Sequence, residues 1–368
     1  MKYLRWLLLP FSLLYGLVVI VRNWLYDAGL FKSYSFKKPV IVVGNLEAGG
    51  AGKSPMTEYL IRLLQKQYQI ATLSRGYGRK TRGFIKAGTT EAAGQAITPG
   101  LNLSATIGDE PAQFHRKFPD LTVAVCEDRV FGLKKLFPEH DLVLMDDAYQ
   151  HRAVEPGLSI LLFDYNRLNE PHFLLPAGNF REPFSGRWRA QVIVVAKCPV
   201  GIGLDEFNNI AERIRPLPYQ ALFFSAINYQ PLHDLYGNQA KVVIDGDTTV
   251  FLLTGIANPK PLLRHVRRST DRIIHHNYPD HHPFTLKNIT KLVAEYNACP
   301  SEKKIIITTE KDAQRLEESW FGPVQHPDAS FPVFVIPIRV GFLNDGGDNF
   351  NKIVTDYVRE HTTNNSLH

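Results

Sequence analysis

The chain has 368 residues, of which 44% are hydrophobic and 21% are charged, a length and composition that predict two domains with buried cores. Its 26 glycines and 24 prolines are too few for a low-complexity chain, and three widely spaced cysteines favour neither a disulfide framework nor a cysteine zinc site and fit a reducing cytosolic compartment. The formal net charge of +6 suits acidic head groups or phosphates better than a nucleic acid, which is not expected as a partner.

The amino terminus carries an apolar segment, residues 6–21, that contains no charge and has basic residues on both sides. As a helix it would be about 24 Å long, shorter than the roughly 30 Å hydrocarbon core, and Pro10 and Gly16 weaken it further. We therefore expect residues 1–30 to form a membrane-associated helix that lies in one leaflet. A full span, a helix packed on the protein and a cleaved signal peptide are the alternatives.

A strand, a glycine-rich turn and a helix follow in that order. Residues 39–43 form a short β-branched run, and residues 57–66 have helical periodicity. Similar apolar runs recur downstream, separated by loop-length or helix-length stretches. This alternation predicts an α/β domain over residues 31–225, with a parallel sheet covered by helices. The further runs are residues 121–125, 142–145, 160–163 and 192–196.

The pattern loosens after Pro216 and a second set of apolar runs begins. These runs predict a second, smaller α/β domain, residues 226–368 with its linker, although the boundary is bracketed only by Pro216 and Thr248. The runs are residues 242–246, 250–255, 304–309 and 333–338.

The glycine-rich turn at residues 44–54 is typical of a P-loop, because backbone N–H groups and a helix N-terminus converge there on one point. Lys53 can reach the β- and γ-phosphates of a nucleotide, and the Ser54 hydroxyl can ligate Mg²⁺. The first motif position is Glu47 instead of glycine, and a turn without a ligand is the alternative. The expected nucleotide-binding residues are Glu47, Ala48, Gly49, Gly50, Ala51, Gly52, Lys53 and Ser54.

A second nucleotide motif ends the apolar run at residues 142–145, where Asp146 and Asp147 follow as a Walker B pattern. One carboxylate can hold Mg²⁺ and the other can orient the same ion or a second one. The alternative is a pair of aspartates that cap the following turn.

Adjacent carboxylates, Asp109 and Glu110, stand at a predicted helix start, where acidic residues also occur as caps. In a kinase, such a carboxylate orients the acceptor hydroxyl and accepts its proton. The distant stretch at residues 278–284 contains His281, which could tune that carboxylate. Its adjacent histidines and interrupting prolines do not match a zinc site, and solvated or capping histidines are the alternative.

The basic loop at residues 74–82 contains Arg75, Tyr77 and Arg79 around two glycines. It suits an anionic substrate group or anionic lipid, and an exposed basic loop without a ligand is the alternative. Arg129, which follows two acidic residues, can form a structural salt bridge or stabilise transferred charge.

Taken in order, these motifs resemble the tetraacyldisaccharide 4'-kinase family over nearly the whole chain. The resemblance implies two α/β/α domains joined by a two-stranded linker, with a nucleotide and an acceptor that meet between them. The separation of the Asp109 and His281 motifs in the sequence leads to the further hypothesis that domain closure assembles the active site. The matching segments are RNWLYDAGL, VGNLEAGGAGKSP, SRGYGR, GDEP, DDAYQH, LLPAGNFREP, TGIANPKP, PDHHPF and TTEKDAQRL.

The resemblance also implies an activity, namely transfer of the ATP γ-phosphoryl group to the 4'-hydroxyl of tetraacyldisaccharide 1-phosphate, which forms lipid IVA. The enzyme would act as a monomer at the cytoplasmic face of the inner membrane, with Mg²⁺. By motif position, Asp109 is the catalytic base and His281 assists it, with Glu110 and Arg129 nearby. Lys53 and Ser54 contact phosphate and magnesium, and Asp146 and Asp147 match the metal-binding pair. The alternatives are a membrane-attached ATPase or GTPase switch or assembly factor and a nucleotide-sensing scaffold, neither of which needs a base aimed at an acceptor.

Overall fold

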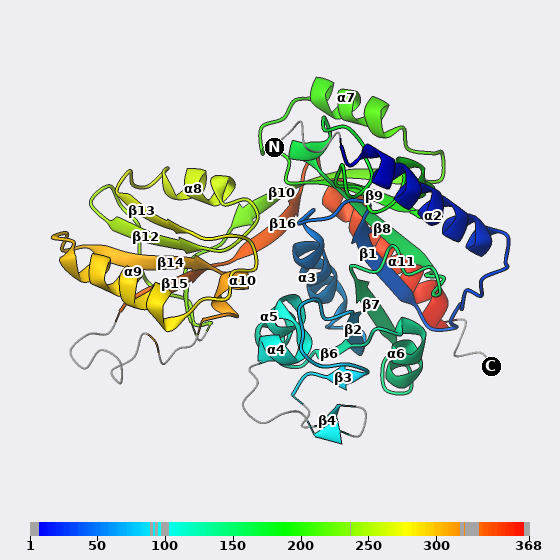
Figure 1. The fold of residues 1–368 in the computed structure, drawn as a ribbon, viewed down its shortest axis with the longest axis horizontal. Helices are drawn as coiled ribbons and strands as arrows, with labels where there is room; N and C mark the ends of the chain where they lie inside the picture. Colours follow the sequence, from blue (N-terminus) through cyan, green and yellow to red (C-terminus); the bar gives the residue numbers. More distant parts are fainter. Residues whose placement is uncertain are drawn as a thin grey trace. The chain divides into compact units, whose positions relative to one another are not determined.

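The computed structural model describes residues 7–88, 91–92, 95–96, 103–235, 237–316, 320 and 331–363. The chain forms two compact units (Figure 1). The first unit comprises Met1–Ile227 and Val340–His368, and the second comprises Asn228–Arg339. The observed junction lies close to the boundary predicted at residue 226. Residues 340–368, which the sequence assigns to the second domain, belong instead to the first unit.

The first unit is built on a sheet of nine strands, counted over the described residues, in the order β16-β10-β9-β8-β1-β7-β2-β6-β3. Neighbouring strands pair in parallel from β10 to β6, and β3 pairs antiparallel to β6. Strand β1 therefore lies at the centre, between β7 and β8. The strands are β1 (Val40–Asn45), β2 (Ile70–Ser74), β3 (Ile85–Lys86), β6 (Thr122–Val125), β7 (Leu142–Asp146), β8 (Leu158–Asp164), β9 (Val192–Ala196), β10 (Ala221–Tyr229) and β16 (Ile338–Phe342).

Helices cover both faces of this sheet, which explains why the central strands are continuous apolar runs. Residues of α3 (Lys53–Leu64), α5 (Asp109–Lys117) and α11 (Gly346–Thr363) share one buried cluster with alternate strand residues such as Ile41. Residues of α6 (Arg129–Leu136) and α7 (Leu204–Ile214) share the cluster on the other face. The predicted parallel sheet covered by helices is thus confirmed. The remaining elements here are α4 (Leu103–Ile107), the β4–β5 hairpin (Glu91–Ala92, Gln95–Ala96), η1 (Tyr165–Arg167) and η2 (Phe184–Arg189).

Helix α11 explains why the end of the chain folds with the first unit. Its apolar stripe of Phe350, Val354 and Val358 is completely buried in the cluster that α3 also lines. The hydroxyl of Tyr357 binds the backbone of Val40, accepting from its N–H at 3.2 Å and donating to its carbonyl at 3.1 Å. The apolar stripe therefore finds its partner on the first sheet.

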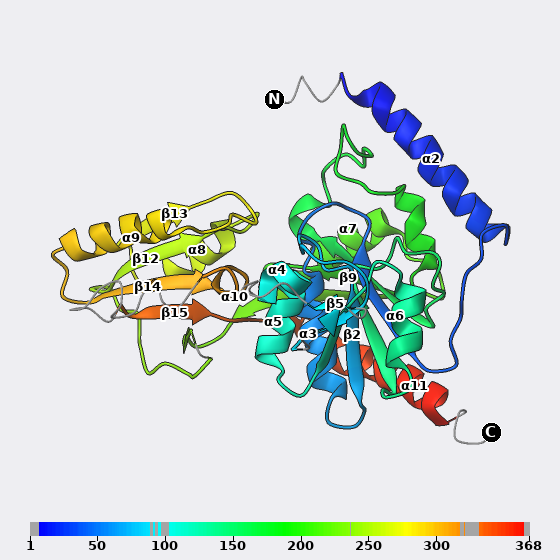
Figure 2. The same ribbon diagram turned by 60° about the horizontal axis from the view of Figure 1, so that its bottom comes forward.

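The apolar helix expected at the amino terminus is α2 (Leu9–Asp27), which stands at the outside of the first unit, apart from its sheet (Figure 2). Its inner face buries Ser12, Gly16 and Val19. Its outer face exposes large apolar side chains, including Leu14 (62%) and Leu17 (59%). By length and composition the helix could cross a membrane, and only 17% of its most apolar window is buried in the protein. A helix buried on all sides is therefore excluded.

The second unit contains a sheet in the order β11-β15-β14-β12-β13, covered by helices. Two buried clusters, one on each face, form its core. The predicted second α/β unit is confirmed, but the strand expected at residues 242–246 is wrong. That run is a loop, whose Val242 and Ile244 pack on the core from outside the sheet. The elements are β11 (His233–Asp234), β12 (Thr249–Thr254), α8 (Lys260–Val266), β13 (Ile273–Asn277), α9 (Leu286–Ala298), β14 (Lys304–Thr309), α10 (Glu310–Ala313) and β15 (Val333–Ile336).

Candidate active site

The glycine-rich loop connects β1 to α3, as the sequence predicts. Gly49 and Gly52 adopt φ angles of +112° and +93°, which favour glycine because other residues rarely take these conformations. Lys53 is the first residue of α3, and its Nζ donates to Oδ1 of Asn45 at 3.1 Å and to the carbonyl of Gly49 at 3.2 Å. The side chain of Lys53 therefore turns back toward the glycine-rich loop, and its ammonium group binds that loop.

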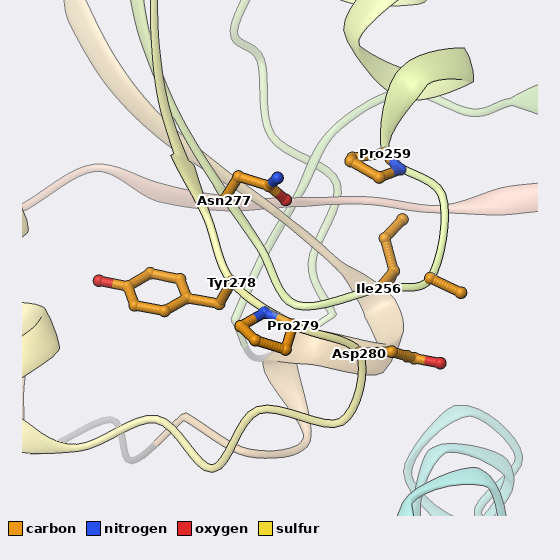
Figure 3. A pocket seen from close by; sticks show the side chains of 7 residues that line it. Ile256, Pro259, Asn277, Tyr278, Pro279 and Asp280 are labelled. Carbon is orange, nitrogen blue, oxygen red and sulfur yellow. The ribbon is translucent and has the colours of Figure 1, made fainter. Parts of the chain in front are cut away.

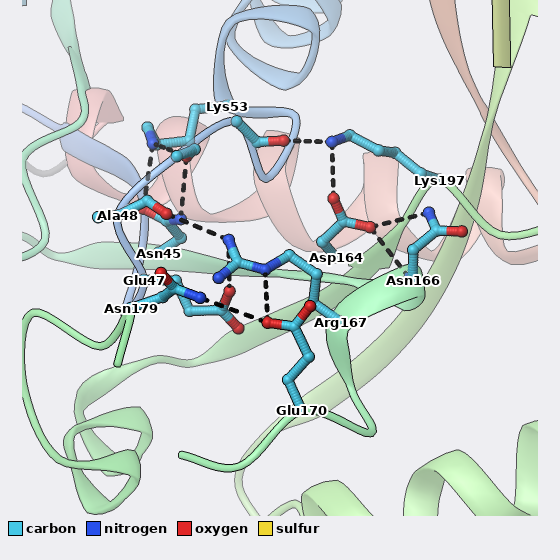
Figure 4. Close-up of polar contacts among 12 residues, drawn as sticks. Asn45, Glu47, Ala48, Lys53, Asp164, Asn166, Arg167, Glu170, Asn179 and Lys197 are labelled. Atoms are coloured by element: carbon cyan, nitrogen blue, oxygen red, sulfur yellow. Dashed lines mark hydrogen bonds and ion pairs between the residues drawn. The ribbon is translucent and has the colours of Figure 1, made fainter. Parts of the chain in front are cut away.

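Glu47, the residue that departs from the motif, points into a buried ion pair (Figure 4). Its Oε2 lies 2.9 Å from Nη1 of Arg167, which also donates to the carbonyl of Ala48 at 3.1 Å. Burial raises the pKa of Glu47, and the charge of Arg167 opposes this effect. Arg167 is in turn 3.3 Å from Glu170. Glu47 is thus neutralised by an arginine and fastens the start of the loop.

A second cation fastens the other end of the loop. Lys197, just after β9, donates from Nζ to the carbonyl of Gly50 and pairs with Oδ2 of Asp164 at 2.7 Å (Figure 4). Its φ of +63° is a left-handed conformation, which is strained for a lysine. The loop is therefore held from two neighbouring strand ends, at β8 and β9.

The two carboxylates at the end of β7 lie against the start of α3. Asp146 is buried and its Oδ1 accepts from the Thr57 hydroxyl at 2.9 Å. Oδ1 of Asp147 lies 3.5 Å from Lys53 Nζ and 2.8 Å from Arg181 Nη1. Ser54 stands in the same first turn of α3, next to Lys53. The structure thus gathers the residues expected to bind magnesium around one helix start.

These two carboxylates have pKa values shifted in opposite directions. Burial raises the pKa of Asp146 to about 7, and the charge of Asp147 acts in the same direction. Burial also works to raise the pKa of Asp147, but Lys53 and Arg181 outweigh it and lower this pKa. The pair therefore places one firmly ionised carboxylate beside one that titrates near neutrality.

Two of the residues expected to act on the acceptor, Asp109 and Glu110, lie on the same unit. Asp109 and Glu110 begin α5, and the charge of Glu110 contributes to the raised pKa of Asp146. Gly108, with φ +97°, precedes them, and a Cβ there would lie 2.9 Å from the carbonyl oxygen of Tyr77. The basic loop containing Tyr77 therefore packs directly against the start of α5.

Three expected cations differ in their environment. Arg129 is buried, and burial together with Arg75 lowers its pKa to about 10, while Asp147 acts in the opposite direction. Arg75 is exposed, so it is available to an anionic group. The side chain of Arg79 is buried and pairs with Glu127 while donating to the carbonyl of Gly83 at 2.9 Å. Arg79 therefore holds the basic loop in shape.

His281 belongs to the second unit, where its backbone takes φ +58° and its N–H donates to the carbonyl of Gly255 at 3.1 Å. Nζ of Lys311 lies 3.0 Å from Nε2 of His281 and 3.6 Å from Asp280. Because an ammonium group only donates, Nε2 is the acceptor and the ring proton of a neutral His281 is on Nδ1.

A pocket of about 390 Å³ precedes His281 in the second unit (Figure 3). The segments after β12 and β13 line it as an open depression. It combines apolar and polar walls, so it can accept a ligand with both kinds of surface. The lining residues are Ile256, Ala257, Pro259, Asn277, Tyr278, Pro279 and Asp280.

Sequence reasoning missed Arg167, Arg181, Lys197 and Lys311. Arg181 stands in the segment LLPAGNFREP and Lys311 in TTEKDAQRL, so the motif resemblance marks both neighbourhoods without assigning a contact. No local pattern links Arg167 or Lys197 to the loop they hold.

Comparisons with known proteins agree over nearly the whole chain. The model of a family described as tetraacyldisaccharide-1-P 4'-kinase matches residues 4–359. A tetraacyldisaccharide 4'-kinase of Bacteroides thetaiotaomicron is 42% identical over 381 residues, which cover 100% of this chain and 96% of the relative. A tetraacyldisaccharide 4'-kinase of Flavobacterium psychrophilum is 42% identical over 373 residues, which cover 99% of this chain and 100% of the relative. The solved structure of LpxK from Aquifex aeolicus in complex with ATP matches with a TM-score of 0.71 at 26% identity, covering 96% of this chain and 99% of that chain.

Proposed function

This chain belongs to the tetraacyldisaccharide-1-phosphate 4'-kinase family, and we propose from that premise that it transfers the γ-phosphoryl group of ATP to the 4'-hydroxyl of a tetraacyldisaccharide 1-phosphate. The product is then lipid IVA. The observation that carries the proposal is the ion pair of Lys53 and Asp147, whose charged atoms lie 3.5 Å apart. It brings together the phosphate loop, which follows β1, and the Walker B carboxylates at the end of the neighbouring strand β7.

Ser54, Asp146 and Asp147 would hold Mg²⁺. Their oxygens are the hard ligands this ion prefers, and two adjacent carboxylates, one of them buried, favour a cation between or beside them. The raised pKa of Asp146 supports this assignment, because a buried acid without a cation resists ionisation. When bound, the ion supplies charge that neutralises the transferring phosphoryl group. Lys53, released from Asn45 and Gly49, would bind the β- and γ-phosphates.

On the acceptor side, Asp109 is the base that orients the sugar hydroxyl and takes its proton. Glu110 and Arg129 lie in the same region of the first unit, and Arg129 would stabilise charge that develops in transfer. Exposed Arg75 and Tyr77 would contact the anionic glycolipid. By motif position we also assign an assisting role in the reaction to His281, which in the second unit accepts at Nε2 from Nζ of Lys311.

Replacement of the base separates this proposal from a nucleotide switch. Asp109→Ala should lower phosphorylation of the glycolipid by about two to four orders of magnitude while ATP binding, measured by fluorescent-analogue competition, persists. A switch would instead hydrolyse ATP without the glycolipid and would tolerate this change. Normal glycolipid phosphorylation by the variant would reject Asp109 as the base.

We also propose that the outer face of α2 anchors the protein in the cytoplasmic face of the inner membrane, as a monomer. Its exposed leucines provide the apolar surface. Leu14→Asp with Leu17→Asp should reduce recovery with lipid vesicles several-fold, whereas Leu286→Asp, on an exposed site of α9, should not. Unchanged vesicle recovery of the double variant would contradict the anchor.

A further inference from the structure

The inner face of α2 binds one irregular segment of the first unit, residues 174–182, which we call the relay segment. The Ser12 hydroxyl donates to the carbonyl of Leu174 at 3.0 Å and accepts from the N–H of Ala177 at 2.8 Å. The Tyr15 hydroxyl donates to the carbonyl of Arg181 at 2.7 Å. Helix α2 therefore holds this segment at both ends by specific hydrogen bonds.

Close packing reinforces these bonds. A Cβ added at Gly16 would lie 2.6 Å from Cδ1 of Leu174, so the side chain of Leu174 packs directly on the helix at this glycine. Asn23 adds a bond from Nδ2 to Oε2 of Glu182 at 3.3 Å. Along α2, successive turns of one face thus contact the same segment.

The relay segment in turn builds one wall of the phosphate loop. The N–H of Arg181 donates to the carbonyl of Leu46 at 2.7 Å, and the N–H of Ala48 donates to the carbonyl of Asn179 at 2.6 Å. Glu47 and Phe180 form an antiparallel bridge between these two bonds. The start of the phosphate loop is therefore hydrogen-bonded, residue by residue, to a segment that α2 holds.

Arg181 joins the two sets of contacts at one residue. Its carbonyl accepts from Tyr15, its N–H donates to Leu46, and its Nη1 lies 2.8 Å from Oδ1 of Asp147. A displacement of its backbone would move both the loop and the carboxylate.

We propose that the membrane helix α2 positions the phosphate and magnesium site, with Tyr15 and Ser12 acting through Arg181 and the relay segment on Leu46 and Asp147. Tyr15, Ser12 and Arg181 are then positioning residues for the kinase reaction, and the helix has a function in catalysis besides contact with lipid. The inference rests on the proposed role of Asp147 in binding magnesium.

The geometry favours a coupling between helix α2 and the magnesium site over a purely structural contact of the helix. The hydroxyl of Tyr15 satisfies the carbonyl of the same residue whose guanidinium binds Asp147, so loss of that bond frees Arg181 to shift. Because the opposite face of α2 is apolar and exposed, lipid would hold the helix where these bonds can form. The prediction is that nucleotide and metal binding depend on the docked helix.

The test compares Tyr15→Phe with Tyr26→Phe, a matched loss of a hydroxyl on the same helix from a ring that contacts Phe31 and Arg152. Both full-length proteins are assayed in lipid vesicles or mixed micelles with ATP, Mg²⁺ and glycolipid varied in turn. Tyr15→Phe should raise the KM for MgATP, and the Mg²⁺ concentration for half-maximal rate, about two- to ten-fold. The KM for glycolipid should stay at the wild-type value, and Tyr26→Phe should change none of these quantities.

Further variants keep the inference open to refutation. Ser12→Ala should raise the same two quantities as Tyr15→Phe. Arg181→Ala should raise the Mg²⁺ concentration for half-maximal rate, and Arg181→Lys should raise it less. A Tyr15→Phe enzyme that is unchanged, or altered only in its KM for glycolipid, overturns the inference. Asp147→Asn is the separate control, because an unaltered Mg²⁺ requirement in that variant refutes the proposed metal role itself. If Asp147→Asn alters the requirement and Tyr15→Phe does not, only the positioning by α2 fails.

Discussion

The strongest prediction concerns Asp146→Asn, which should stabilise the metal-free protein while removing its activity. In the folded chain, burial beside Asp147 raises the pKa of Asp146 to about 7, whereas the ordinary value is 3.8. Asn keeps the oxygen that accepts from Thr57 at 2.9 Å and has no charge to bury. The variant therefore removes the cost of ionising a buried acid and keeps its hydrogen bond.

The sign and size follow from proton linkage. Between pH 4 and 7 the unfolded wild type ionises at this residue while the folded protein stays protonated, so the wild type loses stability as the pH rises. With the two pKa values above, the difference between Asn and Asp grows from under about 2 kcal/mol at pH 5 to about 4 kcal/mol at pH 8, where it levels off. For a unit of this size, about 4 kcal/mol corresponds to a rise in Tm of roughly 8–16 °C.

Thermal unfolding of both proteins in EDTA, in the same detergent at pH 5 and pH 8, measures this difference. Asp147→Asn is the matched control with the opposite expectation, since Lys53 and Arg181 lower the pKa of Asp147 and its charge contributes stability above its ordinary pKa. A gain for Asp146→Asn that is equal at the two pH values, or a loss at pH 8, would refute the reasoning.

Two further substitutions test the packing around the site. Arg167→Ala leaves Glu47 buried without its partner, so the KM for ATP should rise at least about ten-fold in an ATP titration. The double variant Arg167→Ala with Glu47→Gln should recover part of the loss. An unchanged KM in Arg167→Ala would show that the pair does not hold the loop. Gly157→Ala places a Cβ 2.2 Å from the Tyr357 hydroxyl, so it should lower the free energy of unfolding by about 1–3 kcal/mol in a denaturant titration. An unaltered unfolding midpoint would contradict the packing of α11 on the first sheet.

Short sequence patterns predict those candidate site residues that lie close together along the chain. The loop at residues 44–54 is recognisable because strand, glycines and helix are contiguous, and Asp146 and Asp147 because they end an apolar strand. The partner of Glu47 could not be inferred this way, since Arg167 lies on a different strand end and only the fold brings it to the loop.

Other features depended on tertiary packing that no short pattern encodes. Residues 242–246 have strand-like composition, yet they pack on the second core as a loop. Strand β13 was missed because His275 and His276 interrupt its apolar pattern. The apolar stripe of α11 is evident in the sequence, but which sheet it covers is not.

The most direct measurement follows the mass of the glycolipid. Purified protein in lipid vesicles is incubated with the disaccharide 1-phosphate, Mg²⁺ and ATP that is labelled in its γ-phosphate. The mass of the lipid product is then measured by mass spectrometry. We expect the wild type to add one labelled phosphoryl group to the glycolipid and Lys53→Ala to add none detectably. Consumption of ATP with the glycolipid mass unaltered would refute the proposed kinase reaction.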